Sequence, residues 1–562
     1  MLNFTDLYTI ISNDKFIVPI NYILLIATIL FILTLLKVPF KNRFSYRIFI
    51  SLFILVFVAE TYTFKLSNYV FIFSIYSLIC LYLGKMMVLK FTKNNYEFNN
   101  INIIFEFILG FYTLGIIYFI VSHKFFINIF TIQFSKISMF IVLFLIILKV
   151  IHERKRVFFD LKLFKTSLIE NEYILAFMFL SIILSIFIVV NLNVVSTWGW
   201  IGDKFIHVKT YAQEFATLKG YPFKELLPWG FQSALLVPNI FFSGDMVDYM
   251  IKSYNFFGII MMFIILVLPY EIAKNLLNLN KRYCYLASFL TVFFGPLGAP
   301  FIDPYLGLIN IATPIYHNAT TFFTVPIMLL ISYYLYLYYI KRQIENIVIV
   351  IVLLDITFLI KQNGYMLLAP VIGVGIIIYF LKKINVNAFK LSLYLGILLI
   401  IPAIYWITYP RVFGITKLET SVIIGSFCDF YFKYFNENFK SLSGLNPFIK
   451  IGMIIITSLL GIILATTLGN FKEKKIKKFY YSFLVPLFVI SIIIACFLVE
   501  DNYRKYNGNF TWQITLIGVC LMPYVAGLVQ NIKFKVMKSF VIIVLVAQIF
   551  SGMWHLLWAT LY

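Results

Sequence analysis

Charged residues are scarce in this sequence. Only 12% of the 562 residues are Asp, Glu, Lys or Arg, whereas 62% are hydrophobic and the mean hydropathy is +0.93. A soluble protein could not bury so much apolar surface, and repeated apolar runs of about 20 residues are typical of transmembrane helices. The runs lack the short alternation of a membrane barrel. The sequence therefore predicts an all-α, polytopic integral membrane protein, because helices satisfy their own backbone in lipid.

Several motifs are also missing. The chain has no GxxxxGK[ST] loop for a nucleotide phosphate and no HExxH, CxxC or clustered His/Cys pattern for a tight metal site. Its five cysteines are scattered, mostly inside apolar runs, and their spacing indicates no disulfide framework. No basic segment precedes the first apolar run near Phe16 and no small-residue cleavage site follows it, so we expect a retained helix rather than a signal peptide.

The apolar runs predict about sixteen transmembrane helices by the criterion of about 20 residues per span. We place them at 17–36, 48–66, 67–89, 101–121, 130–151, 173–193, 247–269, 283–300, 319–340, 344–360, 364–381, 388–408, 449–469, 479–499, 512–531 and 539–560.

The net charge of +22 follows the same pattern, because Lys and Arg gather in every other loop. Basic loops are typically cytoplasmic, so this excess indicates membrane orientation rather than a nucleic-acid partner. Both termini are then expected on the outer face. The polar outer loops are predicted at 194–246, 301–318, 409–448 and 500–511. No cytoplasmic loop is long enough for a separate catalytic domain.

The first long outer loop contains the segment TWGWIGDKFIHVKTYAQEFATLKGYPFKE, which begins at Thr197. An apolar stripe and a polar stripe recur at helical spacing, which predicts an amphipathic helix in the outer interface. The apolar stripe is Ile201, Phe205, Val208, Ala212 and Phe215, and the polar stripe is Asp203, His207, Thr210 and Glu214. Asp203 follows a span closely, where partial desolvation would raise its basicity. The plainer interpretation is a surface helix with a solvated charged face.

This arrangement resembles the first outer loop of the GT-C superfamily of membrane glycosyltransferases. The resemblance rests on a span, an outer Asp203, an amphipathic helix, and then Gly220-Tyr221-Pro222 and Pro228-Trp229-Gly230. It implies transfer of a sugar from a polyprenyl-phosphate carrier on the outer face, with Asp203 as general base. The family's paired Asp-x-Asp is replaced by Gly202-Asp203-Lys204, so a divalent metal cofactor stays open.

Later outer segments extend the resemblance across about 173–531. They are Phe294-Gly295-Pro296, Tyr316-His317-Asn318, Lys361-Gln362-Asn363-Gly364, Glu500 to Arg504, and Gly508 to Trp512. Residues 167–562 would form the core, and 1–166 an N-terminal bundle added to it. The candidate substrate-binding residues are His207, His317, Lys361, Glu500, Arg504 and Asn509. Lys361 stands between two apolar runs, where a cation could hold a lipid-linked phosphate or simply extend to the interface.

The predicted function is therefore a glycosyltransferase of a bacterial-type plasma membrane, acting on its extracytoplasmic face. The expected partners are a polyprenyl-phosphate sugar donor, a lipid, glycan or protein acceptor, and membrane lipids. Two alternatives stay open. One is a lipid or polysaccharide transporter, and the other is a polysaccharide polymerase or ligase of unrelated fold.

Overall fold

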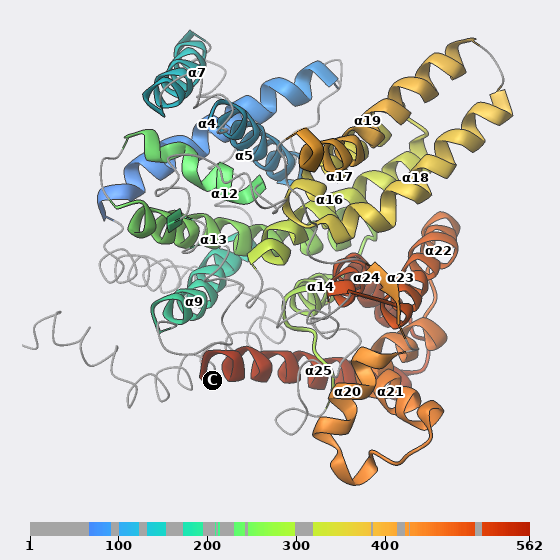
Figure 1. Cartoon of the computed structure of the whole chain (residues 1–562). Helices are drawn as coiled ribbons and strands as arrows, with labels where there is room; N and C mark the ends of the chain where they lie inside the picture. Colours follow the sequence, from blue (N-terminus) through green and yellow to red (C-terminus); the bar gives the residue numbers. More distant parts are fainter. Residues whose placement is uncertain are drawn as a thin grey trace, which may run out of the picture. The chain divides into compact units, whose positions relative to one another are not determined.

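The structure is a computed structural model (Figure 1). The residues it describes are 67–91, 100–122, 132–152, 172–194, 230–241, 245–297, 319–383, 386–412, 422–425, 428–500 and 509–561, with Val208, Ala212 and Gln213. The chain divides into two compact units, one of residues 1–222, 229–267 and 557–562, and one of residues 223–228 and 268–556. The division predicted at 166 and 167 stays a prediction.

The first unit is built on close helix pairs. Its described elements are α4 (Ser67–Phe91), α5 (Asn100–Ser122), α7 (Ile132–His152), α9 (Glu172–Val194), α12 (Gly230–Leu236), a 3-10 turn (Val237–Phe241) and most of α13 (Met246–Glu271). The α4 and α5 helices pack along each other, and α12 lies against α5. The Tyr76 hydroxyl of α4 donates a hydrogen bond to the Ala234 carbonyl of α12 at 3.0 Å.

The second unit is centred on α24 (Trp512–Gln530), in which every residue from Trp512 to Val529 is buried. Its other elements are a π-helical turn (Ile272–Leu276), α14 (Lys281–Phe293), α16 (Ala319–Lys341), α17 (Ile344–Ile360), α18 (Gln362–Lys383), α19 (Val386–Val412), β1 (Val422–Ile424), α20 (Asp429–Asn438), a 3-10 turn (Lys440–Leu442), α21 (Pro447–Leu468), α22 (Lys474–Phe479), a second π-helical turn (Tyr480–Leu484), α23 (Val485–Phe497), β2 (Leu498–Glu500), a second 3-10 turn (Asn509–Thr511) and α25 (Lys535–Leu561). The α14, α16, α21 and α23 helices pack around α24.

The described part contains ten helices long and apolar enough to cross a membrane. The chain is therefore a helical, polytopic membrane protein, as its composition predicts. The total of about sixteen spans stays a prediction, since 17–36 and 48–66 lie outside the described residues.

The span predicted at 283–300 is shorter than expected. The α14 helix ends at Phe293, because Phe294 adopts an extended backbone and the N–H of Gly295 donates instead to the Gln548 carbonyl of α25 at 3.1 Å. A Cβ on Gly295 would lie 2.7 Å from the Cα of Gly552, so α25 approaches at backbone distance. Thirteen helical residues reach about 20 Å, less than the hydrocarbon thickness of about 30 Å.

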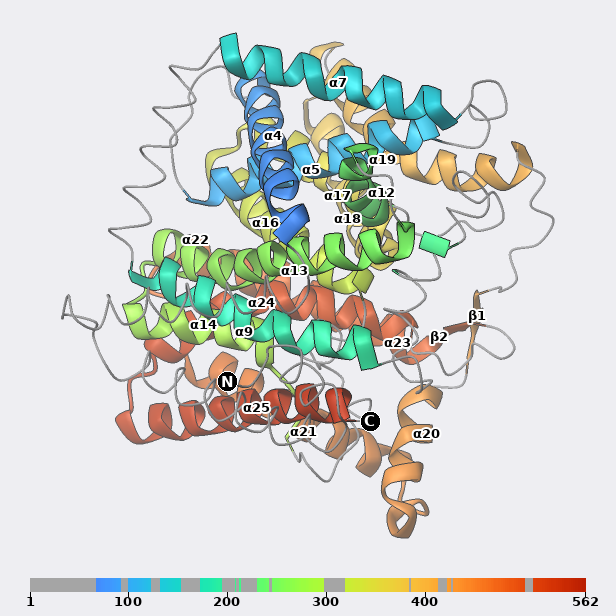
Figure 2. The same ribbon diagram turned by 90° about the vertical axis from the view of Figure 1, so that its left-hand side faces the viewer.

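A short antiparallel ribbon joins the predicted outer loop 409–448 to the end of the predicted span 479–499. Strands β1 and β2 pair Val422 with Glu500, Ile423 with Val499 and Ile424 with Leu498 (Figure 2). The ribbon brings the predicted outer loop 409–448 against the start of the predicted outer segment 500–511. It is the one departure from an all-helical architecture among the described residues.

The amphipathic helix predicted near 201–215 lies almost wholly outside the described residues. Of its apolar stripe, Val208 and Ala212 are described and are fully buried. Gln213, which belongs to neither stripe, is exposed. These three residues agree with an apolar face turned inward, but the helix itself stays a prediction.

Candidate functional site

Lys361 is the single residue between α17 and α18. Its backbone is extended, with φ −149° and ψ 103°, and its N–H donates to the Thr357 carbonyl at 2.7 Å, which ends α17. The α18 helix begins at the next residue. A Cβ at Gly364 would lie 2.8 Å from the Thr357 side chain, so only glycine fits this tight turn without displacement. The turn therefore fixes Lys361 at one end of both helices.

The Lys361 side chain meets the first residue of α24. Its Nζ lies 5.0 Å from the centroid of the Trp512 ring, which is within the range of a cation–π interaction. Trp512 is 7% exposed, whereas Lys361 is half-buried. The aromatic face thus holds the ammonium group at the junction of α17, α18 and α24.

Two described segments that precede Trp512 lie near the same end of α24. Strand β2, which ends at Glu500, packs against the 3-10 turn that begins at Asn509 and leads into α24. The backbones of Glu500 and Asn509 therefore lie near the end of α24 that carries Trp512. The side chains of these two residues are outside the described part of the structure.

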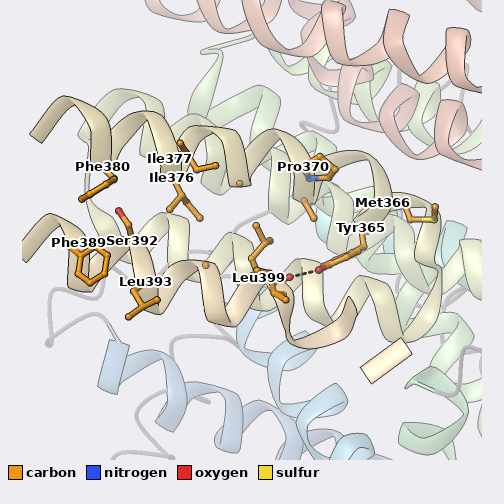
Figure 3. Close-up of a pocket in the computed structure, with 14 residues that line it drawn as sticks. Tyr365, Met366, Pro370, Ile376, Ile377, Phe380, Phe389, Ser392, Leu393 and Leu399 are labelled. Carbon is orange, nitrogen blue, oxygen red and sulfur yellow. Dashed lines mark hydrogen bonds between the residues drawn. The ribbon is translucent and has the colours of Figure 1, made fainter. Parts of the chain in front are cut away.

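An apolar groove runs between α18 and α19, beginning one helical turn after Lys361. It has a volume of about 610 Å³, and Tyr365 and Met366 line one end while Phe380 and Phe389 line the other (Figure 3). The Tyr365 hydroxyl closes the first end by donating to the Leu399 carbonyl. Phe380 and Phe389 close the second end with ring centroids 5.7 Å apart.

The groove faces away from the helical core. Its lining residue Ile377 is 58% exposed and Leu393 is 49% exposed. In a membrane, such apolar side chains contact lipid tails rather than water. The groove can therefore accept a hydrocarbon chain from the bilayer, and Lys361 lies four residues before its first lining residue, Tyr365.

Asp355 lies inside α17, six residues before Lys361. It is partly buried, and its Oδ1 atom has no hydrogen-bond partner among the described residues. An acidic residue inside a membrane helix is a functional candidate, because its burial is costly. The sequence identifies Asp355 as an intramembrane acid but assigns it no role.

Four of the predicted site residues lie outside the described residues, namely Asp203, His207, His317 and Arg504. Of the predicted set, the structure describes the Lys361 side chain and the backbones of Glu500 and Asn509, all near the end of α24 that begins at Trp512. The role of Asp203 stays a prediction.

No group of three or more His, Cys, Asp or Glu side chains that could hold a metal is found in the described ranges. The need for a divalent metal at Asp203 stays open, because that residue is not among them.

The partnership of Lys361 with Trp512 could not be inferred from the sequence. Six described α-helices, α18 to α23, separate the two residues in the sequence, and only packing brings them together. One signal was present, since an aromatic residue at the start of a span is typical of a membrane interface. The groove carried no sequence signal, because its lining residues are those of any lipid-facing helix.

Comparisons with known proteins give no family assignment. No protein family, no curated protein and no solved structure matches the chain. The resemblance to GT-C enzymes therefore rests on the quoted motifs alone.

Proposed function

We propose that the protein is a membrane glycosyltransferase that takes its sugar from a polyprenyl-phosphate donor on the outer face of the membrane. The observation that carries this proposal is the position of Lys361, a cation at the start of α18, the helix that lines an apolar groove open to lipid. A polyprenyl-phosphate sugar has the matching chemistry, because a long hydrocarbon chain ends in an anionic phosphate at the headgroup level.

In this mechanism Asp203 removes the proton from the acceptor hydroxyl or amide. The acceptor atom then attacks the sugar C1, the bond from C1 to the phosphate oxygen breaks, and the configuration at C1 inverts. The leaving group is a polyprenyl phosphate whose added negative charge Lys361 stabilises. Trp512 keeps the ammonium group in place, a contribution of about 0.5–2 kcal/mol for a cation–π contact.

Donor binding tests the role of Lys361. We expect Lys361→Ala to weaken binding of a polyprenyl phosphate to the purified protein, measured by native mass spectrometry, and Lys361→Arg to retain most of it. A hydrogen bond to a charged group contributes about 1.5–3 kcal/mol, which corresponds to about 10- to 100-fold in Kd.

Lys440 provides a matched control, because it is an exposed lysine of the loop 409–448 that was predicted to be outer. Lys440→Ala should leave the Kd unchanged. Equal binding by the Lys361→Ala and Lys440→Ala variants would remove Lys361 from the donor site and leave it as an interfacial anchor.

The role of Asp203 requires a separate assay. We expect Asp203→Asn to abolish sugar transfer while the binding of polyprenyl phosphate is retained, since the amide cannot act as a base but the phosphate site is unchanged. The measurement is transfer of radiolabelled sugar from a lipid-linked donor in membrane vesicles. Transfer at the wild-type rate would exclude Asp203 as the base.

A further inference from the structure

Two of the five cysteines lie together in the second unit, although their spacing in the sequence indicated no pair. The Sγ atoms of Cys428 and Cys496 are 2.8 Å apart. The backbone N–H of Cys428 also donates to the Cys496 carbonyl at 2.8 Å. Cys428 precedes α20 in the predicted outer loop 409–448, and Cys496 lies in the last turn of α23.

The surrounding structure holds this pair in place. The N–H of Gly425 donates to the Phe497 carbonyl at 2.9 Å, and β1 and β2 continue the same line of pairing. Cys428 has φ 57°, a left-handed conformation that residues other than glycine, asparagine and aspartate rarely adopt. A covalent bond between the two sulfur atoms would stabilise this strained backbone, which is otherwise held only by hydrogen bonds.

We propose that Cys428 and Cys496 form a disulfide bond on the outer face of the membrane. The oxidant is a disulfide-bearing thiol oxidoreductase of that compartment, where disulfides persist. One cysteine thiolate attacks the donor disulfide, which forms a mixed disulfide and releases one donor thiol. The second cysteine thiolate then displaces the other donor thiol, so that two protein thiols and one donor disulfide become one protein disulfide and two donor thiols.

The burial of the pair determines when this exchange takes place. Cys428 is 3% exposed and Cys496 is 7% exposed, so a protein oxidant cannot reach them in the closed structure. Because the exchange needs direct access to a sulfur atom, oxidation precedes the closing of the loop onto α23.

The disulfide would tie the loop 409–448 to the last turn of α23, directly before β2. Of the described segments in that loop, α20 contacts both α21 and α23, and β1 pairs only with β2. A disulfide at Cys428 would therefore fix the part of the loop next to β1, while the contact between α20 and α21 fixes its other end. This inference does not depend on the proposed transferase activity.

Counting free thiols in the full-length protein tests the inference directly. The protein is purified without reductant, denatured, and treated with an alkylating reagent before mass analysis. A disulfide leaves three cysteines to be alkylated, namely Cys80, Cys284 and Cys520, and all five react after reduction. Alkylation of all five before reduction overturns the proposal, and so does a reductant-sensitive dimer, because that would place the bond between chains.

Variants supply a second measurement. Reductant should lower the melting temperature of the wild-type protein and leave that of the Cys428→Ser/Cys496→Ser double variant unchanged. Cys284→Ser is the matched control, because Cys284 is also buried but lies in α14, far from the pair in the sequence. This variant should retain the wild-type response to reductant. An identical response to reductant in the double variant and the wild type also overturns the proposal.

Discussion

At the residue scale, two glycines determine how closely α4 and α5 approach. A Cβ on Gly84 would lie 1.7 Å from the Glu106 carbonyl oxygen, and a Cβ on Gly110 would lie 1.8 Å from the Cys80 carbonyl oxygen. Each glycine thus lies four residues after the residue of its own helix that the other glycine approaches. This reciprocal arrangement is the small-residue packing by which membrane helices gain van der Waals contact.

We therefore expect Gly84→Ala and Gly110→Ala each to lower the free energy of unfolding by about 1–3 kcal/mol, the usual cost of overpacking. Thermal unfolding in detergent micelles measures the effect. Gly375→Ala is the control, since a Cβ at Gly375 on α18 meets nothing within 4 Å. A loss as large in the control as in the two variants would mean that the close approach of the helices is not the cause.

Lys361 could be identified as a candidate functional residue from the sequence, whereas its partner could not. Its place between two apolar runs identifies it as a candidate from the sequence alone, and the structure does locate it at the end of α17. The Cys428–Cys496 pair shows the opposite case, because cysteines inside or beside apolar runs usually act as small hydrophobic residues. Only the three-dimensional pairing of two distant segments distinguishes these two from the other three.

At the element scale, the helices that the sequence predicts best are those bounded by polar residues. The α17 helix spans the predicted 344–360, and α24 ends one residue before the predicted 531. The β1–β2 ribbon was missed because strands of three residues show no measurable alternation. The end of α14 was missed because the contact with Gly552 that favours it comes from α25.

The α18–α19 pair gives a prediction about elements. Tyr365 of α18 donates to the Leu399 carbonyl of α19, a hydrogen bond within the apolar groove. We expect Tyr365→Phe to lower the free energy of unfolding by about 0.6–1.7 kcal/mol, the range for hydrogen bonds between membrane helices. Tyr394→Phe on α19, where the side chain is 65% exposed, should change it little. Chemical unfolding of both variants provides the comparison, and equal losses would count against an interhelical bond.

At the scale of the whole molecule, segments predicted to share one side of the membrane contact one another within the second unit. On the predicted outer side, Lys361 meets Trp512 and β1 pairs with β2. On the predicted cytoplasmic side, the N–H of Asn280 donates to Gln530 at 2.7 Å. These contacts agree with the alternation of basic loops.

Two engineered cysteines decide the orientation. Ser441 lies in a predicted outer loop and Lys475 in a predicted cytoplasmic one, and both are exposed, whereas all five native cysteines are buried. We expect a membrane-impermeant maleimide to label the Ser441→Cys variant in intact cells and the Lys475→Cys variant only after permeabilisation. The reverse pattern would place Lys361 and Trp512 on the cytoplasmic face. The proposed outer-face transferase would then fail, and so would the oxidising compartment that the disulfide requires.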